Sequence, residues 1–544
     1  MKLLLLLLRA SWRSVVLAGL IGAASGVASV GLMALIMSTL RDPRGASLLT
    51  VGLFAALCAA IFVTRIGSQF LLCRMTQGNV AELRMGLCRR ILDSPLKHLE
   101  EIGVDRMLAC LTGDVNLISQ LINGLPGLVV NLAILACGAV YLATLSLPLV
   151  ASCGVLAILG VAVYRFAARW AGKYVTRSRL AQDVLLKRVH GMIEGIKELK
   201  VHHDRRREYF DQVIQAQDAV RHSQYLGDTF HDVAVVGGRM MFLVAIGLLV
   251  FVWPRVTKID SVTLTSYVLA VMYLIPSLEG IVGWLPSVAW AMGSVAHIER
   301  LGLTLEEQSR ENATLSPIGG WQEIELLGVT HAYRREGQGN GFELGPLDLT
   351  INRGQIIFLV GGNGTGKTTL AKLLSGLYVP ERGQILLDGQ PITSANREGY
   401  RQLFSVVFDD AVIFDSLWGL SAGDLDQRAQ EFLHQLGLSH VVTVTNGVFS
   451  TTSLSRGQRK RLALVTAYLE DRPIYLFDEW AADQDPAFRK IFYQHLLPEL
   501  KSRGKTVVAI THDDRYFTEA DQVVKLEEGK VVQTLRHETE FINR

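Results

Sequence analysis

One glycine-rich segment of the sequence carries the residue types that bind nucleotide phosphates. It follows the strand-length apolar run 355–360 and reads Gly361-Gly362-Asn363-Gly364-Thr365-Gly366-Lys367-Thr368-Thr369. Glycines let backbone N–H groups curl around phosphate oxygens, the lysine reaches the β- and γ-phosphates, and the first threonine offers its hydroxyl to Mg²⁺. The spacing therefore predicts a phosphate loop between a strand and a helix, with nucleotide phosphates and Mg²⁺ as the ligands.

A group of acidic residues follows a second apolar run. Residues 476–486 read LFDEWAADQDP, so four carboxylates fall within eight positions. Asp478 ends the run and is placed to ligate the metal that a phosphate loop needs, while Glu479 would polarise the attacking water. Taken alone, such an acidic pair is more often a helix cap or a solvated turn. The phosphate loop upstream favours the catalytic interpretation.

The composition indicates a membrane protein with a soluble part. Of 544 residues, 49% are hydrophobic and only 19% are charged, which is too apolar for an ordinary soluble protein. The formal charge of +3 gives no electrostatic footprint for nucleic acid, so no nucleic-acid partner is expected. The six cysteines match neither a metal-site signature nor a CxxC redox pair.

Long apolar runs locate the membrane half in residues 1–300. Since about 20 apolar residues cross a bilayer, we predict six spans, near residues 14–40, 46–72, 120–144, 147–168, 229–253 and 262–292. The segments expected to face the cytoplasm carry nineteen Lys and Arg residues, against four in the external loops. This bias orients the spans with the N-terminus inside. The helix-friendly segment 165–227 predicts long cytoplasmic extensions that turn near residues 194–198.

After residue 300 the apolar runs shorten to strand length and alternate with helical patterns. Residues 301–320 are interpreted as a linker and residues 321–544 as an α/β domain of ordinary size. The predicted fold class is therefore multidomain: an α-helical transmembrane domain of six helices, followed by an α/β P-loop ATPase domain.

The chain resembles the ATP-binding-cassette family. Beside the phosphate loop and the acidic pair, it has Leu454-Ser455-Arg456-Gly457-Gln458, which is similar to the family signature and places the serine 23 residues before Asp478. The resemblance implies that Ser455 and Gly457 open a helix and bind the γ-phosphate held by the opposite subunit, with Gln458 also in the ATP site.

Three further positions take their roles from this resemblance. His512, after the strand-like run 506–510, is similar to the switch histidine that contacts the γ-phosphate. Asp485 stands at the acidic position of the D-loop, residues 481–485, and Tyr333 is the candidate aromatic that stacks on adenine. Outside this context, the histidine would be a polar strand cap and the tyrosine a core residue.

One position departs from the family pattern. A glutamine that ligates Mg²⁺ usually stands in a loop after the phosphate-loop helix, and Asp409 occupies that position here. Asp409 could replace the glutamine as a metal ligand, or it could merely occupy the loop. The sequence leaves both options open.

A single cassette cannot complete an ATP site in this family, so the resemblance implies a homodimer with two composite sites. ATP would close the two cassettes and hydrolysis would reopen them. Coupling to the membrane half is expected through residues 95–105 and 194–200. The expected location is the bacterial inner (plasma) membrane, as a multi-pass protein in contact with lipid, with the ATPase domain in the cytoplasm.

The cargo is suggested by weaker features. The string at 478–486, Asp409 and the doubled acid after His512 together resemble the bacterial cyclic-peptide exporter branch, and Trp480, in place of a usual proline, is interpreted as a marker of that branch. This implies ATP-driven export of a cyclic peptide or a pyoverdine-like peptide siderophore precursor. An outer-membrane efflux partner is left open. The alternative is a lipid flippase or a broad-specificity drug exporter with the same ATPase.

Three ionisable residues lie centrally within predicted spans: Arg65, Arg239 and Glu279. Charge inside a membrane is costly and tends to face a cavity or a partner. They are therefore candidates for a polar cargo cavity. An ion pair between helices, or a position nearer the membrane surface, explains them equally well.

Overall fold

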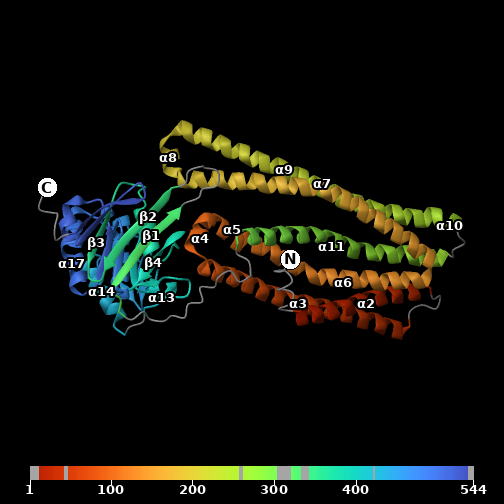
Figure 1. Ribbon diagram of the computed structural model, residues 1–544. Helices are drawn as coiled ribbons and strands as arrows, with labels where there is room; N and C mark the ends of the chain where they lie inside the picture. Colours follow the sequence, from red (N-terminus) through yellow and green to blue (C-terminus); the bar gives the residue numbers. More distant parts are fainter. Residues whose placement is uncertain are drawn as a thin grey trace. The chain divides into compact units, whose positions relative to one another are not determined.

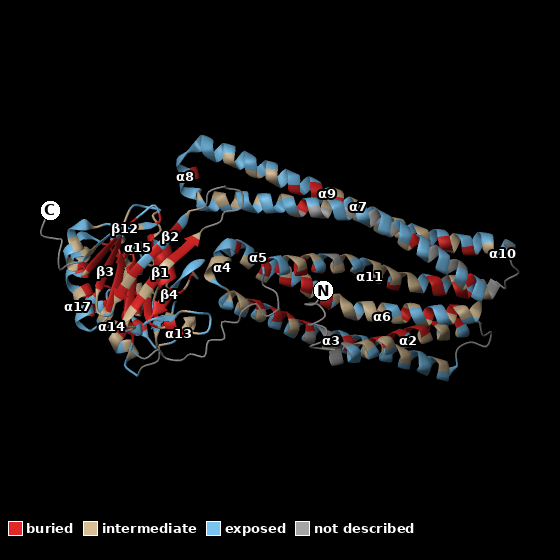
Figure 2. Ribbon diagram, in the orientation of Figure 1, coloured by how far each residue is buried: buried red, intermediate tan, exposed pale blue. Residues whose placement is uncertain are grey.

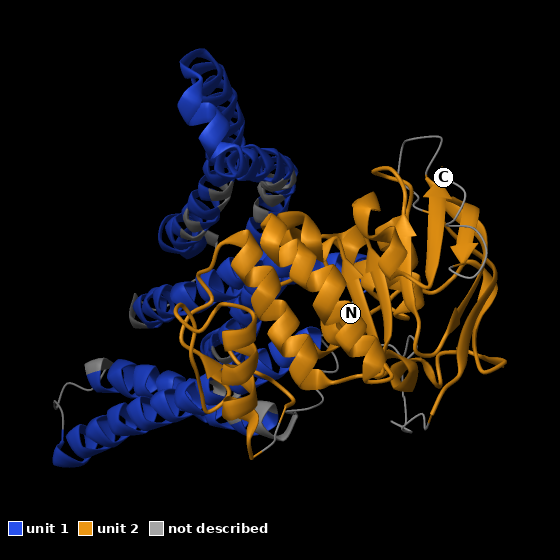
Figure 3. Cartoon of the chain, turned by 90° about the vertical axis from the view of Figure 1, so that its left-hand side faces the viewer, with its two compact units in different colours: residues 1–88, 107–304 blue, residues 89–106, 305–544 orange. Residues whose placement is uncertain are grey.

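The computed structural model describes most of the chain and divides it into two compact units. The described residues are 12–41, 47–256, 261–302, 320–332, 342–420 and 423–536. One unit comprises residues 1–88 and 107–304, and the other comprises residues 89–106 and 305–544 (Figure 3). The second unit therefore joins a short segment from the helical half to the α/β half of the sequence.

The first unit is built from long helices (Figure 1). They are α2 (Trp12–Arg41), α3 (Leu48–Asp93, which continues into the second unit), α6 (Val115–Leu145), α7 (Leu147–Glu194), α9 (His203–Gly247) and α11 (Ser261–Arg300). Shorter segments are α5 (Val104–Ala109), α8 (Ile196–Val201), α10 (Trp253–Val256) and two π-helical turns, η1 (Cys110–Asp114) and η2 (Leu248–Val252). Helices α7 and α9 run side by side, and α6 packs against both α2 and α11.

Several of these helices are long and apolar enough to cross a membrane. Within the described residues, five segments qualify by length and composition: Gly19–Thr39, Leu48–Asp93, Val104–Leu145, His203–Arg255 and Thr263–Arg300. Their outward surfaces carry large apolar side chains, such as Phe62 and Phe70 on α3, which are 67% and 70% exposed. Such surfaces need lipid or a partner to cover them. The number of six spans and their boundaries stay predictions.

Two predicted breaks in the helical half are confirmed. Ser146 is extended and separates α6 from α7, where Pro148 is tolerated because it stands in the first turn of the new helix. Gly195 interrupts the other long stretch, so α7 ends at Glu194 and the short α8 leads into α9. The predicted turn near residues 194–198 lies at this place.

The second unit contains two main sheets. A four-stranded antiparallel sheet has the order β2-β1-β4-β5 and a six-stranded sheet has the order β12-β11-β3-β10-β9-β6. The first comprises β1 (Glu323–Ala332), β2 (Glu343–Asn352), β4 (Arg382–Leu387) and β5 (Gln390–Pro391); the second comprises β3 (Ile356–Val360), β6 (Phe404–Val407), β9 (Ile474–Asp478), β10 (Thr506–Ile510), β11 (Gln522–Glu527) and β12 (Lys530–Arg536). A small hairpin joins β7 (Val444–Thr445) and β8 (Val448–Phe449).

The six-stranded sheet is parallel except at its β12 edge, and its central strands β3, β9 and β10 are buried on both faces (Figure 2). Successive residues of β3 point into different clusters, because Phe358 packs with α15 (Arg456–Glu470) and Ile357 packs with α12 (Lys367–Leu374). A strand buried on both faces explains the continuous apolar runs in the sequence. Since the strands are parallel, the carboxyl ends of β3, β9 and β10 meet at one edge.

Further helices complete the second unit. They are α4 (Leu96–Ile102), α13 (Arg397–Arg401), α14 (Leu425–Gln435), η3 (Trp480–Asp483), α16 (Pro486–Ile491), η4 (Phe492–Leu496), α17 (Leu497–Ser502) and η5 (Asp514–Glu519). The predicted fold class, a helical transmembrane domain followed by an α/β P-loop domain, is confirmed by this arrangement.

Candidate functional site

The phosphate loop connects β3 to α12, as its sequence predicts. Gly361 has a φ of 151°, and a Cβ at this position would come within 2.3 Å of the Leu526 carbonyl oxygen. Only glycine fits so close to the neighbouring strand. Lys367 opens the helix, and its Nζ donates hydrogen bonds to the carbonyl oxygens of Gly361 (3.1 Å) and Gly362 (2.9 Å). The ammonium is therefore held inside the loop, where phosphate oxygens would bind.

Burial of Lys367 in this loop disfavours its positive charge. The side chain of Lys367 is only 5% exposed, and burial lowers its pKa, although the negative charges of Glu479 and Asp478 oppose the change. An anion that brings further negative charge would restore the favourable surroundings of the ammonium. Phosphate groups supply such charge, which agrees with the predicted ligand.

The next two residues extend the site to the end of β9. Asp478 is the last residue of this strand and is buried, and its Oδ1 accepts a hydrogen bond of 3.3 Å from the Thr368 hydroxyl. Burial, together with the nearby charges of Glu479 and Asp409, raises the pKa of Asp478 to about 6. A carboxylate and a hydroxyl beside a phosphate loop fit Mg²⁺, which favours oxygen ligands and takes only one or two from protein.

The described residues form no larger metal-binding cluster. Within the described residues, three or more His, Cys, Asp or Glu side chains do not gather around a common point. A zinc-type site is therefore not formed by these residues. The pair Thr368 and Asp478 is the group that could hold the predicted metal.

Glu479 has an unusual backbone conformation and a defined partner. Its φ of 47° and ψ of 35° lie in the left-handed region, which costs about 1–2 kcal/mol for a residue with a side chain. Its Oε1 lies 3.1 Å from Nε2 of His512 and 3.9 Å from Nζ of Lys367. The carboxylate therefore lies between the phosphate loop and the end of β10.

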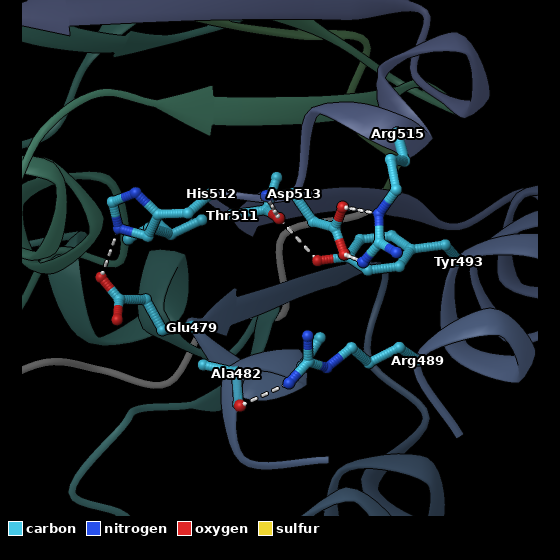
Figure 4. Close-up of a pocket in the computed structure, with 10 residues that line it drawn as sticks. Glu479, Ala482, Arg489, Tyr493, Thr511, His512, Asp513 and Arg515 are labelled. Atoms are coloured by element: carbon cyan, nitrogen blue, oxygen red, sulfur yellow. Dashed lines mark hydrogen bonds and ion pairs between the residues drawn. The ribbon is translucent and has the colours of Figure 1, made fainter. Parts of the chain in front are cut away.

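The strand ends enclose a cavity of about 380 Å³ next to this pair (Figure 4). Glu479 and His512 lie on one side of it, and Thr511 bonds the Tyr493 hydroxyl at 2.6 Å. On the far side, Asp513 accepts two hydrogen bonds from Arg515, at 2.8 and 2.7 Å, and these hold the pKa of Asp513 below its ordinary value.

The signature residues form a helix cap and lie against the D-loop. Ser455 caps α15 through a reciprocal pair, because its Oγ accepts from the Gln458 N–H and its own N–H donates to the Gln458 side chain. A Cβ on Gly457 would come within 2.9 Å of the Asp483 carbonyl oxygen, so glycine permits this contact. In the described part of the chain, none of these hydrogen bonds reaches the phosphate loop of the same subunit.

Asp409 lies beyond the end of β6 and is engaged by two cations. Its Oδ1 accepts from Lys460 at 2.6 Å, and its Oδ2 accepts from Arg456 at 2.9 Å. Burial by itself would raise the pKa of Asp409, but the bonds and charges of Lys460 and Arg456 outweigh it and lower the pKa. Both oxygens are occupied in this arrangement, so metal ligation by Asp409 stays a prediction.

Lys460, Arg456 and Asp483, for which the sequence predicts no role, meet beside Asp409, and Trp480 packs behind Lys460. Lys460 and Arg456 also form ion pairs with Asp483, at 2.6 and 3.0 Å. Trp480 is fully buried, stacks on Phe492 with ring centroids 4.5 Å apart, and donates from Nε1 to the Lys460 carbonyl oxygen at 2.7 Å. The sequence signal for this contact was the pair of cations one helical turn apart.

The remaining candidates fall in several places. Asp485 caps α16 by accepting from the Phe488 N–H and also pairs with Arg461 at 2.8 Å. Tyr333 lies outside the described residues. Arg65 is exposed on α3 and Glu279 is half-buried on α11, while Arg239 belongs to α9 but its side chain is not among those described. The three cavity candidates thus lie on three separate helices.

Fold and site together define a P-loop ATPase joined to membrane-spanning helices. Two family models match the chain: "ABC transporter" over residues 344–482 and "ABC transporter transmembrane region" over residues 11–218. The ATP-binding protein SyrD of Pseudomonas syringae pv. syringae is 37% identical over 531 residues, which cover 95% of this chain and 93% of SyrD. The chain therefore belongs to the ABC transporter family. It is an exporter-type half-transporter, with one membrane domain and one cassette, that couples ATP hydrolysis to transport.

Two further similarities are a match over half of the chain and a match of the fold at low sequence identity. An ATP-dependent lipid A-core flippase of Alkalilimnicola ehrlichii is 31% identical over 289 residues, which cover 50% of this chain and 47% of the flippase. A structure of a bacterial Atm1-family ABC exporter with ATP bound matches with a TM-score of 0.79, over 97% of this chain and 95% of that one. At 17% identity this last match shows the shared fold.

Proposed function

We propose that the chain forms a homodimer in the bacterial inner membrane and exports a peptide cargo, with its cassettes in the cytoplasm. The observation that carries this proposal is the extent of the similarity to SyrD, which covers 95% of the chain and so includes the membrane half that meets cargo. The name of SyrD states ATP binding and no cargo. The cargo class, a cyclic peptide or a pyoverdine-like siderophore precursor, rests on the resemblance of segment 478–486 to the cyclic-peptide exporter branch.

The residues of the cassette are proposed to have separate roles in ATP hydrolysis. Lys367 and the N–H groups of its loop bind the phosphates, and Thr368 and Asp478 hold Mg²⁺, which supplies charge neutralisation when bound. Glu479 orients the attacking water and accepts its proton, and His512 contacts the γ-phosphate.

The other half of the site is expected from the second subunit. The signature residues of each subunit (Ser455, Gly457 and Gln458) are proposed to complete the site of its partner, and Asp485 acts across the same interface. This is supported by the hydrogen bonds of the signature, which do not reach the phosphate loop of their own subunit. Tyr333 is proposed to stack on adenine.

The contacts of α4 support coupling between the cassette and the membrane half. Within the second unit, Glu100 accepts hydrogen bonds from Lys372 Nζ (2.8 Å) and from the Tyr378 hydroxyl, and Lys97 pairs with Glu381 at 2.7 Å. Lys372 belongs to α12, whose first residue is the phosphate-binding Lys367. Movement of α12 on ATP binding is therefore proposed to pull directly on α4, while α8 forms the second coupling segment.

The cargo proposal can be tested by ATPase and transport assays in liposomes. Purified protein is supplied with a cyclic lipopeptide, a peptide siderophore precursor, or lipid A, and ATP turnover and cargo accumulation are measured. Stimulation by a peptide and not by lipid A supports peptide export. Stimulation by lipid A alone would favour the flippase alternative, which the similarity to the lipid A-core flippase supports over half the chain. The polar cavity residues Arg65, Arg239 and Glu279 are proposed to contact the peptide.

A further inference from the structure

The buried ammonium group of Lys460 binds the backbone of Glu479, whose carboxylate is proposed to be catalytic. The side chain of Lys460, on the second turn of α15, is only 2% exposed. Its three N–H donors face three oxygens: Asp409 Oδ1 at 2.6 Å, Asp483 Oδ2 at 2.6 Å and the Glu479 carbonyl oxygen at 2.8 Å. A lysine can be buried in this way only when it is paired, and here Nζ donates two hydrogen bonds, to Asp409 and to the Glu479 carbonyl oxygen, and forms an ion pair with Asp483.

The three acceptors belong to three different segments around the ATP site. Asp409 lies in the loop after β6, Glu479 follows β9, and Asp483 belongs to η3 in the D-loop. Arg456, one helical turn before Lys460, binds the same two carboxylates from the solvent side, where its side chain is 60% exposed. We call these four residues (Arg456, Lys460, Asp409 and Asp483) the Lys460 cluster. The cluster links α15, which begins with the signature residues, to the loop after β6 and to the D-loop.

A second hydrogen bond joins α15 to η3, and here the donor belongs to η3. Lys460 Nζ donates to the Glu479 carbonyl oxygen, and the next residue, Trp480, donates from its ring nitrogen to the Lys460 carbonyl oxygen at 2.7 Å. Trp480 is itself fixed by full burial and by stacking on Phe492. This reciprocal pair clamps the left-handed backbone of Glu479, and the direction of a side chain follows from the backbone that carries it.

We propose that Lys460 is a positioning residue for ATP hydrolysis: it holds the Glu479 backbone so that the carboxylate meets the attacking water. It rests on the proposed role of Glu479. Lys460 has no hydrogen bond to the described residues of the phosphate loop. We therefore expect its loss to affect kcat and KM for ATP differently. Loss of Lys460 lowers kcat for ATP, while KM for ATP stays close to its original value.

The chain offers a matched control at the other end of α15. Asp471 is also left-handed (φ 51°), and Lys505 donates to its carbonyl oxygen at 2.8 Å while pairing with its carboxylate at 2.9 Å. Lys505 thus binds the backbone of a left-handed acidic residue, as Lys460 binds that of Glu479. Asp471 has no place in the ATP site, so Lys505→Met reports the structural cost of losing such a bond.

The experiment measures ATPase kinetics, nucleotide affinity and thermal unfolding of the full-length protein in liposomes. Lys460→Met is expected to lower kcat by about 10²-fold, the effect of a misplacement of about 1 Å, with unchanged nucleotide affinity, while Lys505→Met keeps its kcat. Should Lys460→Met fail to fold because two carboxylates lose their cation, the triple variant K460M/D409N/D483N removes these charges. It is expected to fold and to show the same loss of kcat.

Two results would overturn the inference. One is a kcat for Lys460→Met, or for the folded triple variant, that matches the original protein. The other is an equal loss of kcat in Lys460→Met and Lys505→Met in step with their unfolding temperatures, which would assign Lys460 a structural role only. Glu479→Gln, measured in parallel, separates the two proposals: normal turnover in that variant removes the role of Glu479 itself.

Discussion

The Nε2 atom of His512 lies 3.1 Å from the Oε1 atom of Glu479. The two residues follow β10 and β9, parallel neighbours whose register pairs Ile510 with Asp478, so the sheet brings together side chains that are 33 positions apart. A histidine beside a carboxylate can hold it in one orientation and can also sense a nearby phosphate. This contact links the group that is proposed to activate water with the group that is proposed to detect ATP.

Replacing Glu479 by glutamine tests the first of these roles. The amide cannot accept the proton from water, so we expect kcat to fall by about 10²–10⁴-fold, while ATP affinity is kept because the phosphate loop is unchanged. Phosphate release and binding of a fluorescent ATP analogue check both parts. Glu499→Gln, an exposed carboxylate on α17, is the control. Normal turnover in Glu479→Gln would remove the residue from catalysis.

Replacing His512 by alanine tests the second role. Removal of one group that is proposed to contact the γ-phosphate and to orient Glu479 is expected to cost about 10²-fold in kcat. The comparison is with His495→Ala, an exposed histidine on η4. If both histidine variants hydrolyse ATP at the original rate, His512 is a polar strand cap and nothing more.

Local sequence patterns were enough to predict the phosphate loop and the acid at the end of β9. The glycine-rich turn between strand and helix depends on a few adjacent residues, and once it is recognised it favours a metal-ligand interpretation of the acid after the second apolar strand. The predicted gap between the spans 120–144 and 147–168 and the predicted turn near residues 194–198 also used local signals, a proline and a glycine. These features are confirmed by the structure.

The contacts of Asp409, Asp483 and Trp480 could not be predicted in the same way. They join three loops and a helix, and which charged groups meet depends on the packing of α15 against the sheet. Trp480 was interpreted as a marker of the cargo branch, and the structure shows that its ring nitrogen also donates a hydrogen bond to the Lys460 carbonyl oxygen. The local sequence could not decide whether Asp409 faces a metal or a lysine, since both are attractive partners for a carboxylate.

Glu100 gives a test of coupling between α4 and the cassette. Glu100→Ala removes the bonds to Lys372 and Tyr378, so cargo stimulation of the ATPase should weaken by about fivefold or more, as for typical coupling energies. Basal turnover should fall less. Glu101→Ala is the matched control, because Glu101 is the next residue of the same helix and is exposed. Identical behaviour of the two variants would speak against the coupling role.

Glu279 tests the proposed cargo cavity. Its side chain is half-buried on α11 within a helix apolar enough to span a membrane, so Glu279→Gln removes a charge that a polar peptide could pair with. We expect the cargo-stimulated ATPase to fall more than the basal ATPase, and Arg239→Gln should behave likewise. Equal loss of both activities would favour an interhelical ion pair over a cargo contact.

A carboxylate at the end of α15, exposed at the surface but partly desolvated by its neighbours, makes a prediction about pH. Glu470, at the end of α15, accepts a hydrogen bond from Ser405 at 2.8 Å. Desolvation by neighbouring atoms raises its pKa above the ordinary value of 4.5, although the Ser405 bond and the charge of Arg472 oppose this change. A raised carboxyl pKa means that the folded protein binds the proton more tightly than the unfolded chain. Its contribution to stability is therefore full below pH 4.5 and is lost as the pH rises through the folded pKa.

Glu470→Gln should consequently stabilise the cassette at neutral pH, because the amide keeps an acceptor for Ser405 and has no charge to bury. For a domain of this size, each kcal/mol of relieved cost raises Tm by about 2–4 °C. The gain should shrink as the pH is lowered from 8 to 5, where the original carboxyl begins to take up its proton. Thermal unfolding across this range measures it, with Glu431→Gln on the exposed face of α14 as the control. A gain that is independent of pH would show that desolvation of the charge is not its cause.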